Sequence, residues 1–597
     1  MGIAVGLLDA RLRYHVLALG MLLATLVVLT HNGAVVSADE GAVLAQARIL
    51  QQSGQWSMGN RFEAVDPRGE WFGIDISDTN GRRWFPYAKH PLYPEIARWA
   101  GAAGGQLGVE LVSAAGTVVA AAAAALVARR LRPAAPVPHL DLFTLWGVGV
   151  LSPLFFDGFW AIAHSLGAAA ATAALLTAIR ARDALDERAD GRAVGWSAAM
   201  AVALAVCVLL RSEGMLWGLA LSGAIAVGSA GRRRVPSLAV AAAAASTTVG
   251  AWWLDGRWHG SVIGTPIAPF HIRGASGGFV ADRLRGVWAS VLRPQLLDST
   301  PAGTIALVVA VLVVAVAAYV RWRPLETTLI VGLSGLAATG AVVLLFLPHA
   351  PLPGLLIGCP ILGGAVVLFR WRTLVADPVA KIILVTSGLF ALAVVSTQYP
   401  VGGSMEWAGR FFHLMLPSLA PVVIATVLIA GRSIGVGVRT GDTGAVVRGA
   451  IGAPTATGTA TGPRRTVARL LVALLIAYAL LSVGTIVRIR GITADIVDRI
   501  VVMSHMTGVD PPVVVANMEA VGRLSWREAV DGGGYLRVTD SHDLGAVARA
   551  LRREGIERFV FAAAHDPRRD RNRLEGYRGV GEQVTVHGWE LTVMGRS

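Results

Sequence analysis

The stretch QLGVELVSAAGTVVAAAAAALVARRLRP, residues 106–133, joins a long apolar run to an arginine-rich end. A bilayer core of about 30 Å needs roughly 20 apolar residues in one helix, and residues 106–128 supply that length. Arginines directly after such a run are typical of a helix that ends at the cytoplasmic face of a membrane. The stretch therefore predicts a transmembrane helix, and the same pattern recurs along the chain.

The composition of the whole chain is that of a polytopic membrane protein. Of its 597 residues, 54% are hydrophobic and only 15% are charged, which is too apolar for a soluble protein. The net charge of +14 does not indicate nucleic-acid binding, because the arginines lie in short clusters between apolar runs. Cys207 and Cys359 lie within apolar runs, which excludes a disulfide framework and a CxxC metal site. The strong preference for arginine over lysine indicates a GC-rich, actinobacterial type of source.

About thirteen apolar runs are long enough to cross a bilayer. The first is interpreted as a retained span, because no small-residue cleavage site stands out after it. The chain is therefore predicted to be an α-helical polytopic membrane protein with about 13 transmembrane helices. The expected spans are residues 14–31, 106–128, 139–156, 159–179, 194–210, 213–230, 236–254, 302–320, 326–347, 351–369, 379–397, 412–430 and 467–488.

The arginine clusters predict the orientation, because cytoplasmic loops carry the excess of positive charge. With a cytoplasmic N-terminus every inside loop is basic, and an odd number of spans places the C-terminal tail outside. The protein is thus expected in the plasma membrane, with an extracytoplasmic C-terminal domain. The inside loops are residues 129–133, 180–192, 231–236, 321–324, 370–373 and 431–466.

Three regions lie outside the apolar core. Residues 31–105 form a long first outer loop. Residues 431–466 are rich in Gly, Thr and Ala without periodicity, which predicts a disordered cytoplasmic linker before a last transmembrane helix at 467–490. The tail, residues 491–597, alternates strand-like and helical runs and predicts a small α/β domain. Its strands are expected at 512–517, 558–564 and 584–595, and its helix at 543–555.

Two adjacent carboxylates, Asp39 and Glu40, follow the first apolar run. Ser37 and Glu40 fit the S-x-x-E capping box, and apolar residues follow at helical spacing, so the pair can simply start an interfacial helix. A carboxylate at the rim of a membrane cavity can also act as a general base or coordinate a divalent cation. The two interpretations are compatible, because Glu40 can cap the helix while Asp39 points elsewhere.

Four further stretches, together with the acidic pair and the long first outer loop, resemble the GT-C superfamily of glycosyltransferases that use polyprenyl-phosphate-linked sugars. The resemblance covers most of residues 1–430, which would form a GT-C-like catalytic region. It rests on the order of the motifs along the chain more than on any single motif. The stretches are RWFPYAKHPLYPEIARWA (83–100), LSPLFFDGFWAIAHSL (151–166), LLRSEGMLWGLAL (209–221) and GGSMEWAGRFFHLMLPSLAP (402–421).

The resemblance implies a membrane enzyme that transfers a sugar from a polyprenyl-phospho-sugar donor, for example decaprenyl-phospho-arabinose or a phospho-mannose. The acceptor would be a cell-envelope glycan, lipid or protein. Asp39 would be the general base, and Glu40 would orient it or bind a metal; the need for a divalent cation stays open. Inversion at the anomeric carbon would follow from direct displacement. The donor phosphate would bind Lys89, His90, Arg211 and Arg410, which the topology places on the outer side.

Four of the charged residues have a simpler structural explanation as well. Arg211 and Glu213 can reach water from the end of a span, and two residues apart on one helix they are not expected to pair with each other. Each would then need another partner. Arg410 and Glu406 are four residues apart and can form an ion pair instead of a donor site.

The stretch 151–166 contributes two more polar residues. Asp157 is the single acidic residue of the second outer turn, where several of the families have an acidic cluster, so its role stays open. His164 lies in an apolar run and is expected to be a hydrogen-bonded packing residue rather than a ligand.

Two other classes of protein remain as alternatives. A membrane transporter or lipid flippase also carries intramembrane charges, but transporters commonly contain internal repeats, and no repeat is visible here. The long first outer loop and the outer tail also argue against a transporter. A non-catalytic scaffold for envelope assembly would share the fold of the enzyme.

Overall fold

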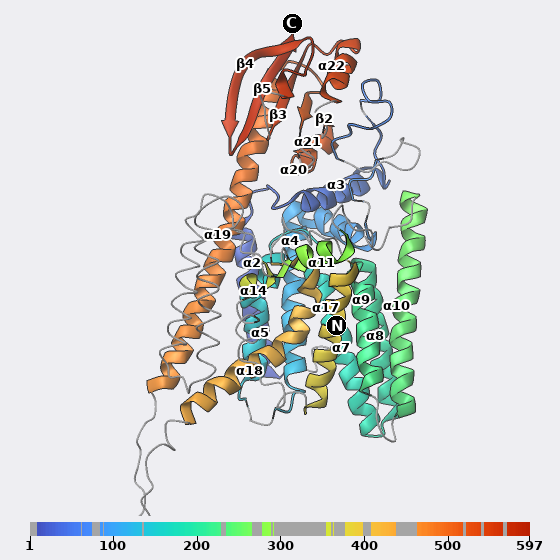
Figure 1. The fold of residues 1–597 in the computed structure, drawn as a ribbon, viewed down its shortest axis with the longest axis vertical. Helices are drawn as coiled ribbons and strands as arrows, with labels where there is room; N and C mark the ends of the chain where they lie inside the picture. Colours follow the sequence, from blue (N-terminus) through green and yellow to red (C-terminus); the bar gives the residue numbers. More distant parts are fainter. Residues whose placement is uncertain are drawn as a thin grey trace, which may run out of the picture.

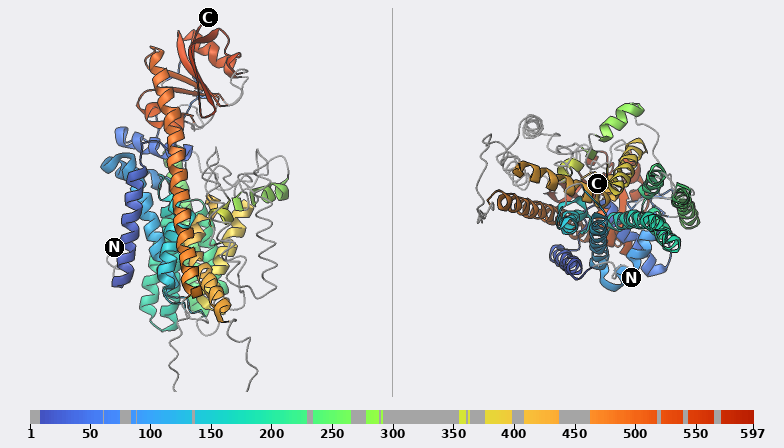
Figure 2. Two further views of the ribbon diagram at one scale, coloured as in Figure 1. Left: turned by 90° about the vertical axis from the view of Figure 1, so that its left-hand side faces the viewer. Right: turned by 90° about the horizontal axis from the view of Figure 1, so that it is seen from below.

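The structure is a computed structural model in which a bundle of long helices carries a small domain of strands and helices at one end (Figures 1 and 2). The C-terminus lies in that domain, and helix α3 lies between the two parts (Figure 1). The structure describes residues 9–60, 62–74, 84–87, 89–133, 137–228, 234–264, 278–287, 290–291, 354–359, 362, 376–397, 408–436, 462–517, 521–538, 543–564 and 570–597.

The described helices of the bundle confirm a multi-pass membrane protein. Five helices within the described ranges are long and apolar enough to cross a membrane, namely α2 (Ala10–Thr30), α4 (Leu92–Ala128), α8 (Asp190–Leu210), α10 (Arg234–Ile263) and α17 (Pro378–Thr397). The other elements are α3 (Ala38–Ser53), α5 (Leu140–Leu151), α6 (Pro153–Asp157), α7 (His164–Asp186), α9 (Glu213–Val227), α11 (Phe279–Val287), α14 (Leu355–Gly358), η4 (Arg410–Met415), α18 (Leu416–Val436) and α19 (Gly462–Met506).

The predicted total of thirteen spans is not tested, because two predicted spans and most of a third lie outside the described residues. These are 302–320, 326–347 and 351–369. The predicted linker 431–466 is shorter than expected, since α18 continues to Val436 and α19 begins at Gly462. Residues 437–461 of that linker also lie outside the described residues.

Helix α4 is interrupted where the sequence has two glycines. Gly104 (φ −149°, ψ 20°) and Gly105 (φ 61°, ψ −150°) are not helical, and the positive φ of Gly105 is a conformation that glycine adopts without steric cost. The predicted span 106–128 therefore begins directly after this kink. The part of α4 before the kink belongs to the first outer loop.

The predicted spans 139–156 and 159–179 are wrong at the ends where they meet. Helix α5 stops at Leu151, because Ser152 caps the next helix and Pro153 occupies its first position. The five-residue helix α6 follows, and α7 begins only at His164. Residues 152–165 therefore form a buried connection between α5 and α7 instead of the ends of two spans.

Helix α3 lies across the end of the bundle that carries the small domain (Figure 1). We call this domain, residues 513–597, the outer domain, and this end the outer end, after the predicted side of the membrane. It begins as the capping pattern predicts, since the Ser37 hydroxyl accepts a hydrogen bond from the Glu40 amide at 3.2 Å. It ends at Gly54, which has φ 67° and donates its N–H to the Leu50 carbonyl. Residues on all sides of α3 are buried, because it packs against the bundle below and the outer domain above.

Helix α19 is one continuous helix of 45 residues. At about 1.5 Å per residue it is roughly 68 Å long, which exceeds the thickness of a bilayer. In Figures 1 and 2 it runs along the bundle and into the outer domain. The predicted boundary at residues 490–491 is therefore wrong, because the helix continues to Met506 before the first strand.

The outer domain contains a five-stranded sheet in the order β2-β1-β3-β5-β4. Strands β1 (Val513–Ala516), β2 (Gly534–Arg537) and β3 (Arg558–Ala563) are parallel, whereas β4 (Tyr577–Val586) and β5 (Trp589–Arg596) form an antiparallel hairpin next to β3. The connecting helices are α20 (Val521–Leu524), α21 (Trp526–Asp531) and α22 (Asp543–Arg553). The predicted α/β character of the tail is confirmed.

Two details of the outer domain differ from the prediction. The run 584–595 was expected to be one strand, but His587 (φ 47°) and Gly588 (φ 83°) form a tight turn that divides it into β4 and β5. Strand β2, which begins at Gly534, was not among the expected strands.

Candidate active site

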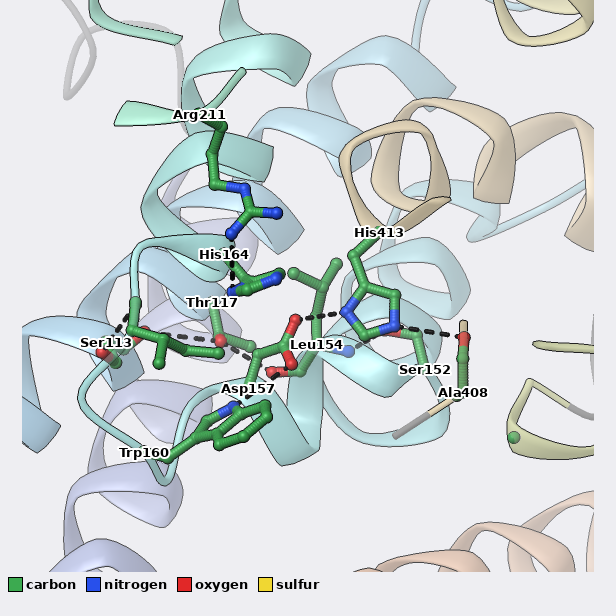
Figure 3. Close-up of polar contacts among 12 residues, drawn as sticks. Ser113, Thr117, Ser152, Leu154, Asp157, Trp160, His164, Arg211, Ala408 and His413 are labelled. Carbon is green, nitrogen blue, oxygen red and sulfur yellow. Dashed lines mark hydrogen bonds and ion pairs between the residues drawn. The ribbon is translucent and has the colours of Figure 1, made fainter. Parts of the chain in front are cut away.

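Most of the predicted site residues meet at the outer end of the bundle. Asp39 lies in the first turn of α3, Lys89 on the loop that leads into α4, and Arg410 at the start of η4. The junctions α6–α7 and α8–α9 supply the polar residues of a deeper layer, and Figure 3 shows this layer. Five separate segments of the chain therefore build the site.

The carboxylate of Asp39 binds two positively charged side chains. One oxygen, Oδ2, accepts hydrogen bonds from Lys89 Nζ at 3.1 Å and from Arg410 Nη1 at 2.8 Å. Burial opposes ionisation of this carboxyl, but the charges of Lys89 and Arg410 outweigh it and hold the pKa of Asp39 well below its usual range. Asp39 is consequently a carboxylate at neutral pH, and its partner Lys89 is half-exposed.

Glu40 has different partners from Asp39 and is completely buried. Its Oε1 accepts the backbone N–H of Ala161 at 2.8 Å, and its Oε2 accepts that of Val36 at 2.6 Å. Burial, together with the nearby carboxylate of Glu110, raises the pKa of Glu40 to about 7, although the charge of Arg490 opposes the rise. Both oxygens are thus engaged by backbone amides, and Glu40 anchors α3 to the loop that precedes α7.

A buried ion pair below Glu40 was not predicted from the sequence. Arg490 of α19 and Glu110 of α4 are both fully buried, with 2.7 Å between Nη2 and Oε1. Arg490 also donates to the carbonyls of Thr30 and Phe159. Arg490 therefore connects α19 to α2, to α4 and to the turn after α6.

Arg211 and Glu213 form a bidentate ion pair, contrary to the prediction. Arg211 Nη2 lies 2.6 Å from Glu213 Oε1, and Nε lies 3.1 Å from Oε2. The two residues are not on one helix, because Arg211 is extended (φ −149°, ψ 135°) at the end of α8 and Glu213 begins α9. The break lets the two side chains turn toward each other, and Glu213 is buried.

Asp157 and His413 form a second buried pair, which Figure 3 shows. His413 Nδ1 lies 2.6 Å from Asp157 Oδ2, and His413 Nε2 lies 3.2 Å from the carbonyl oxygen of Ala408. Because that carbonyl is an acceptor, Nε2 carries a proton, and a further proton lies between Nδ1 and Oδ2. The pair therefore holds two protons, as imidazolium and carboxylate or as neutral imidazole and carboxylic acid. Trp160 Nε1 donates to the other oxygen of Asp157 at 3.3 Å.

His164 lies between Arg211 and the pair of Asp157 and His413, as Figure 3 shows. Its Nδ1 lies 3.3 Å from Arg211 Nη1, its ring stacks on Trp160 with 6.2 Å between centroids, and it meets the His413 ring edge-on at 6.0 Å. Its Nε2 is buried and has no hydrogen-bond partner among the described residues. The prediction of a packing residue accounts for its ring contacts but not for that unused nitrogen.

Two predicted site residues do not join this group. His90 is buried and its Nδ1 lies 2.8 Å from Asp255 Oδ2 on α10, so it ties the loop to α10 instead of facing Asp39. Glu406, the expected ion-pair partner of Arg410, lies outside the described residues. Of the four predicted phosphate ligands, Lys89 and Arg410 contact Asp39 directly, and Arg211 is close enough to Lys89 to act on it electrostatically.

The described residues contain no cluster of three or more His, Cys, Asp or Glu side chains arranged to hold a metal ion. Asp39 binds Lys89 and Arg410, whereas both oxygens of Glu40 accept backbone amides, so the two carboxylates do not point to a shared ligand. Whether the reaction needs a divalent cation therefore stays open, because the described residues do not supply a set of ligands for one.

Sequence signals existed for some of the missed residues. His413 lies inside GGSMEWAGRFFHLMLPSLAP, three residues after Arg410, and was not singled out. Glu110 is the single charge in the run 106–128, and a charge inside a span is functional or paired more often than incidental. Arg490 had no comparable signal, because it lies at the predicted end of a span, where arginine is common.

No protein-family model and no curated protein matches the chain. Among solved structures it is similar to ArnT from Cupriavidus metallidurans in the apo state, with 13% identity, 98% of each chain covered and a TM-score of 0.49. ArnT bound to undecaprenyl phosphate gives 14% identity, 97% coverage of each chain and a TM-score of 0.49. The oligosaccharyltransferase AglB from Archaeoglobus fulgidus, in complex with an inhibitory peptide and a dolichol-phosphate, has 10% identity and a TM-score of 0.46, covering 93% of this chain and 70% of AglB.

Proposed function

We propose that this protein is a glycosyltransferase that moves a sugar from a polyprenyl-phosphate-linked donor to a glycan, lipid or protein acceptor at the outer face of the plasma membrane. The observation that carries the proposal is the cluster in which Asp39 binds both Lys89 and Arg410. In such a cluster the carboxylate can accept the proton of an acceptor hydroxyl while the two basic side chains bind the donor phosphate beside it. The sequence resemblance supplies the class of donor.

The two cations suit the phosphate of the donor. Arg410 presents a planar guanidinium that can bind phosphate oxygens in pairs, and Lys89 supplies a mobile ammonium group. Arg211 is held by Glu213 and His164, so we assign it a supporting positive charge instead of the main phosphate contact. This modifies the sequence prediction, in which Arg211 was a principal phosphate ligand.

The transfer step uses Asp39 as the general base. The acceptor oxygen forms a bond to the anomeric carbon, while the bond from that carbon to the phosphate oxygen breaks and leaves its electron pair on the phosphate. The acceptor proton moves to Asp39, and Lys89 with Arg410 stabilises the charge that develops on the departing polyprenyl phosphate. Direct displacement of this kind inverts the anomeric configuration.

The arriving donor also makes Asp39 a stronger base. With both cations on Asp39 its pKa is low, so the carboxylate accepts a proton poorly. A donor phosphate that binds Lys89 and Arg410 draws these charges away from Asp39, and the pKa of the carboxyl then rises. Asp39 is therefore a stronger base when the donor is bound than in its absence.

The test is the variant Asp39→Asn, purified and assayed with decaprenyl-phospho-arabinose and decaprenyl-phospho-mannose. Asparagine keeps the shape but not the basicity, so transfer should fall by about 100-fold or more while undecaprenyl phosphate still binds. The matched control is Asp495→Asn, because Asp495 on α19 is an exposed aspartate that pairs with His587 and does not contact Asp39, Lys89 or Arg410. Full transfer activity of Asp39→Asn would remove Asp39 as the base.

A further inference from the structure

The outer domain covers the helix that carries Asp39. We propose that this domain, residues 513–597, is a positioning element that holds Asp39 and the first outer loop in their places in the active site. The inference rests on the proposed function, and it assigns a role to a domain whose contribution the sequence left open. Three sets of contacts carry it.

The first contact is at Gly41, two residues after Asp39. A Cβ atom at Gly41 would overlap the backbone carbonyl oxygen of Arg523, which lies in α20 of the outer domain. Backbone cannot move aside as the end of a flexible side chain can, so glycine is required for this approach. The first turn of α3 is thereby pressed directly against the outer domain.

The second contact holds the other end of α3. Gln52 Nε2 donates to Asp531 Oδ1 at 2.8 Å, and Arg48 forms an ion pair with the same carboxylate, with 3.4 Å between Nε and Oδ1. Asp531 is the last residue of α21. Exposed ion pairs contribute little stability individually, but two donors on one carboxylate fix the direction of the helix.

The third contact joins the first outer loop to the sheet. Arg537 N donates to the carbonyl of Trp71 at 2.6 Å, Gly73 N donates to the carbonyl of Tyr535 at 2.9 Å, and Phe72 bridges Leu536 in antiparallel fashion. The loop thus adds a short strand to the free edge of β2, with backbone hydrogen bonds that depend little on side chains.

The bundle holds α3 from the opposite side. Glu40 accepts the amide of Ala161, and the Gln106 side chain of α4 donates to the carbonyl of Ala34 while accepting from Arg527 of the outer domain. Helix α3 is therefore clamped between two parts of the molecule that α19 connects. Its position, and with it the position of Asp39, depends on both parts.

The test is Gly41→Ala in the full-length protein, with Gly250→Ala as the matched control. A Cβ atom at Gly250, in the middle of α10, would lie within 4 Å of no atom of the described residues. The methyl group at position 41 must push α3 or α20 away, and misplacement of a reacting group by about 1 Å can cost about 100-fold in rate. We expect kcat of Gly41→Ala to fall by about that factor, with little change in the affinity for undecaprenyl phosphate. An unchanged kcat would overturn the proposal.

A second measurement does not depend on activity. The pair Gln52→Cys and Asp531→Cys should react with a short bifunctional thiol reagent, since the natural Cys207 and Cys359 are buried. The cross-link should form in high yield and become rarer when Gly41→Ala is added. Absence of the cross-link, or a yield that Gly41→Ala leaves unchanged, would overturn the positioning role. If the wild type transfers no sugar, the proposed function fails, whereas the cross-link yields still decide whether the outer domain holds α3.

Discussion

Removal of the His413 side chain tests the buried pair beneath the site. The side chains of Asp157 and His413 are 0% and 1% exposed, and 2.6 Å separates Oδ2 from Nδ1. In His413→Ala the carboxylate of Asp157 keeps one hydrogen bond, from Trp160, and loses its charged or proton-sharing partner. The same variant releases the carbonyl of Ala408, which lies in a left-handed turn (φ 50°) directly before Gly409 and Arg410.

The expected cost follows from burial. Breaking a buried pair by removing one partner costs about 3–5 kcal/mol, because the remaining charge is left without compensation. The chain offers a matched exposed pair of the same chemistry, His587 Nε2 and Asp495 Oδ2, at 2.8 Å with side chains 39% and 63% exposed. An exposed pair contributes about 0–1 kcal/mol, so His587→Ala should change stability by no more than that. The cost of His413→Ala should therefore exceed that of His587→Ala by about 2–5 kcal/mol.

The measurement is the free energy of unfolding in mixed micelles, followed by tryptophan fluorescence, for both histidine variants and for Asp157→Leu combined with His413→Phe. An apolar replacement of both partners should recover most of the lost stability, since no buried charge remains. If His413→Ala costs no more than His587→Ala, the pair does not carry the stability that its burial implies, and the argument fails.

Two further predictions follow from the other buried groups. Arg211→Lys should lower transfer at least tenfold and Arg211→Ala further, because lysine cannot replace both hydrogen bonds to the buried Glu213; equal transfer by wild type and Arg211→Lys would favour a side chain that merely reaches for water. Glu40 has a pKa raised to about 7 by burial, so the unfolded chain releases this proton more easily and stability should fall as the pH rises from about 4.5 through 7. Glu40→Gln should flatten that pH dependence of the free energy of unfolding, by up to about 3 kcal/mol, and an unchanged slope would show that Glu40 titrates normally.

Local features of the fold could be predicted from the sequence. The cap at Ser37 and Glu40 and the start of a span after Gly105 depend on residues close together in the chain. The error at Arg211 and Glu213 has the same origin, since the argument assumed that one helix continues through both residues. The sequence LLRSEG contains no proline, and only a glycine after Glu213 hints at the break.

The partners within the site could not be predicted, because they are distant along the chain. Asp39 and Arg410 are 371 residues apart, and His413 and Asp157 are 256 apart. Which helix faces lie together is decided by the packing of the whole bundle, and apolar periodicity says little about it when helices are apolar on most sides. The resemblance indicated stretches that the structure brings together, but the contacts between them came only from the structure.

The charges of the described residues suit the transfer of a phosphate-linked group at a membrane surface. Arg211 with Glu213 and Asp157 with His413 are each balanced within the pair, whereas Asp39 faces two cations, which leaves one positive charge in excess. A phosphodiester donor brings one negative charge and makes the group of Asp39, Lys89, Arg410 and phosphate neutral. In the proposed transfer step Asp39 takes up a proton and the polyprenyl phosphate leaves with two negative charges, so the group would be neutral again. An uncompensated charge near hydrocarbon is costly, so a site that stays neutral before and after the step avoids this cost. With only one basic side chain, or with a third unpaired one, the site would carry a net charge at both stages.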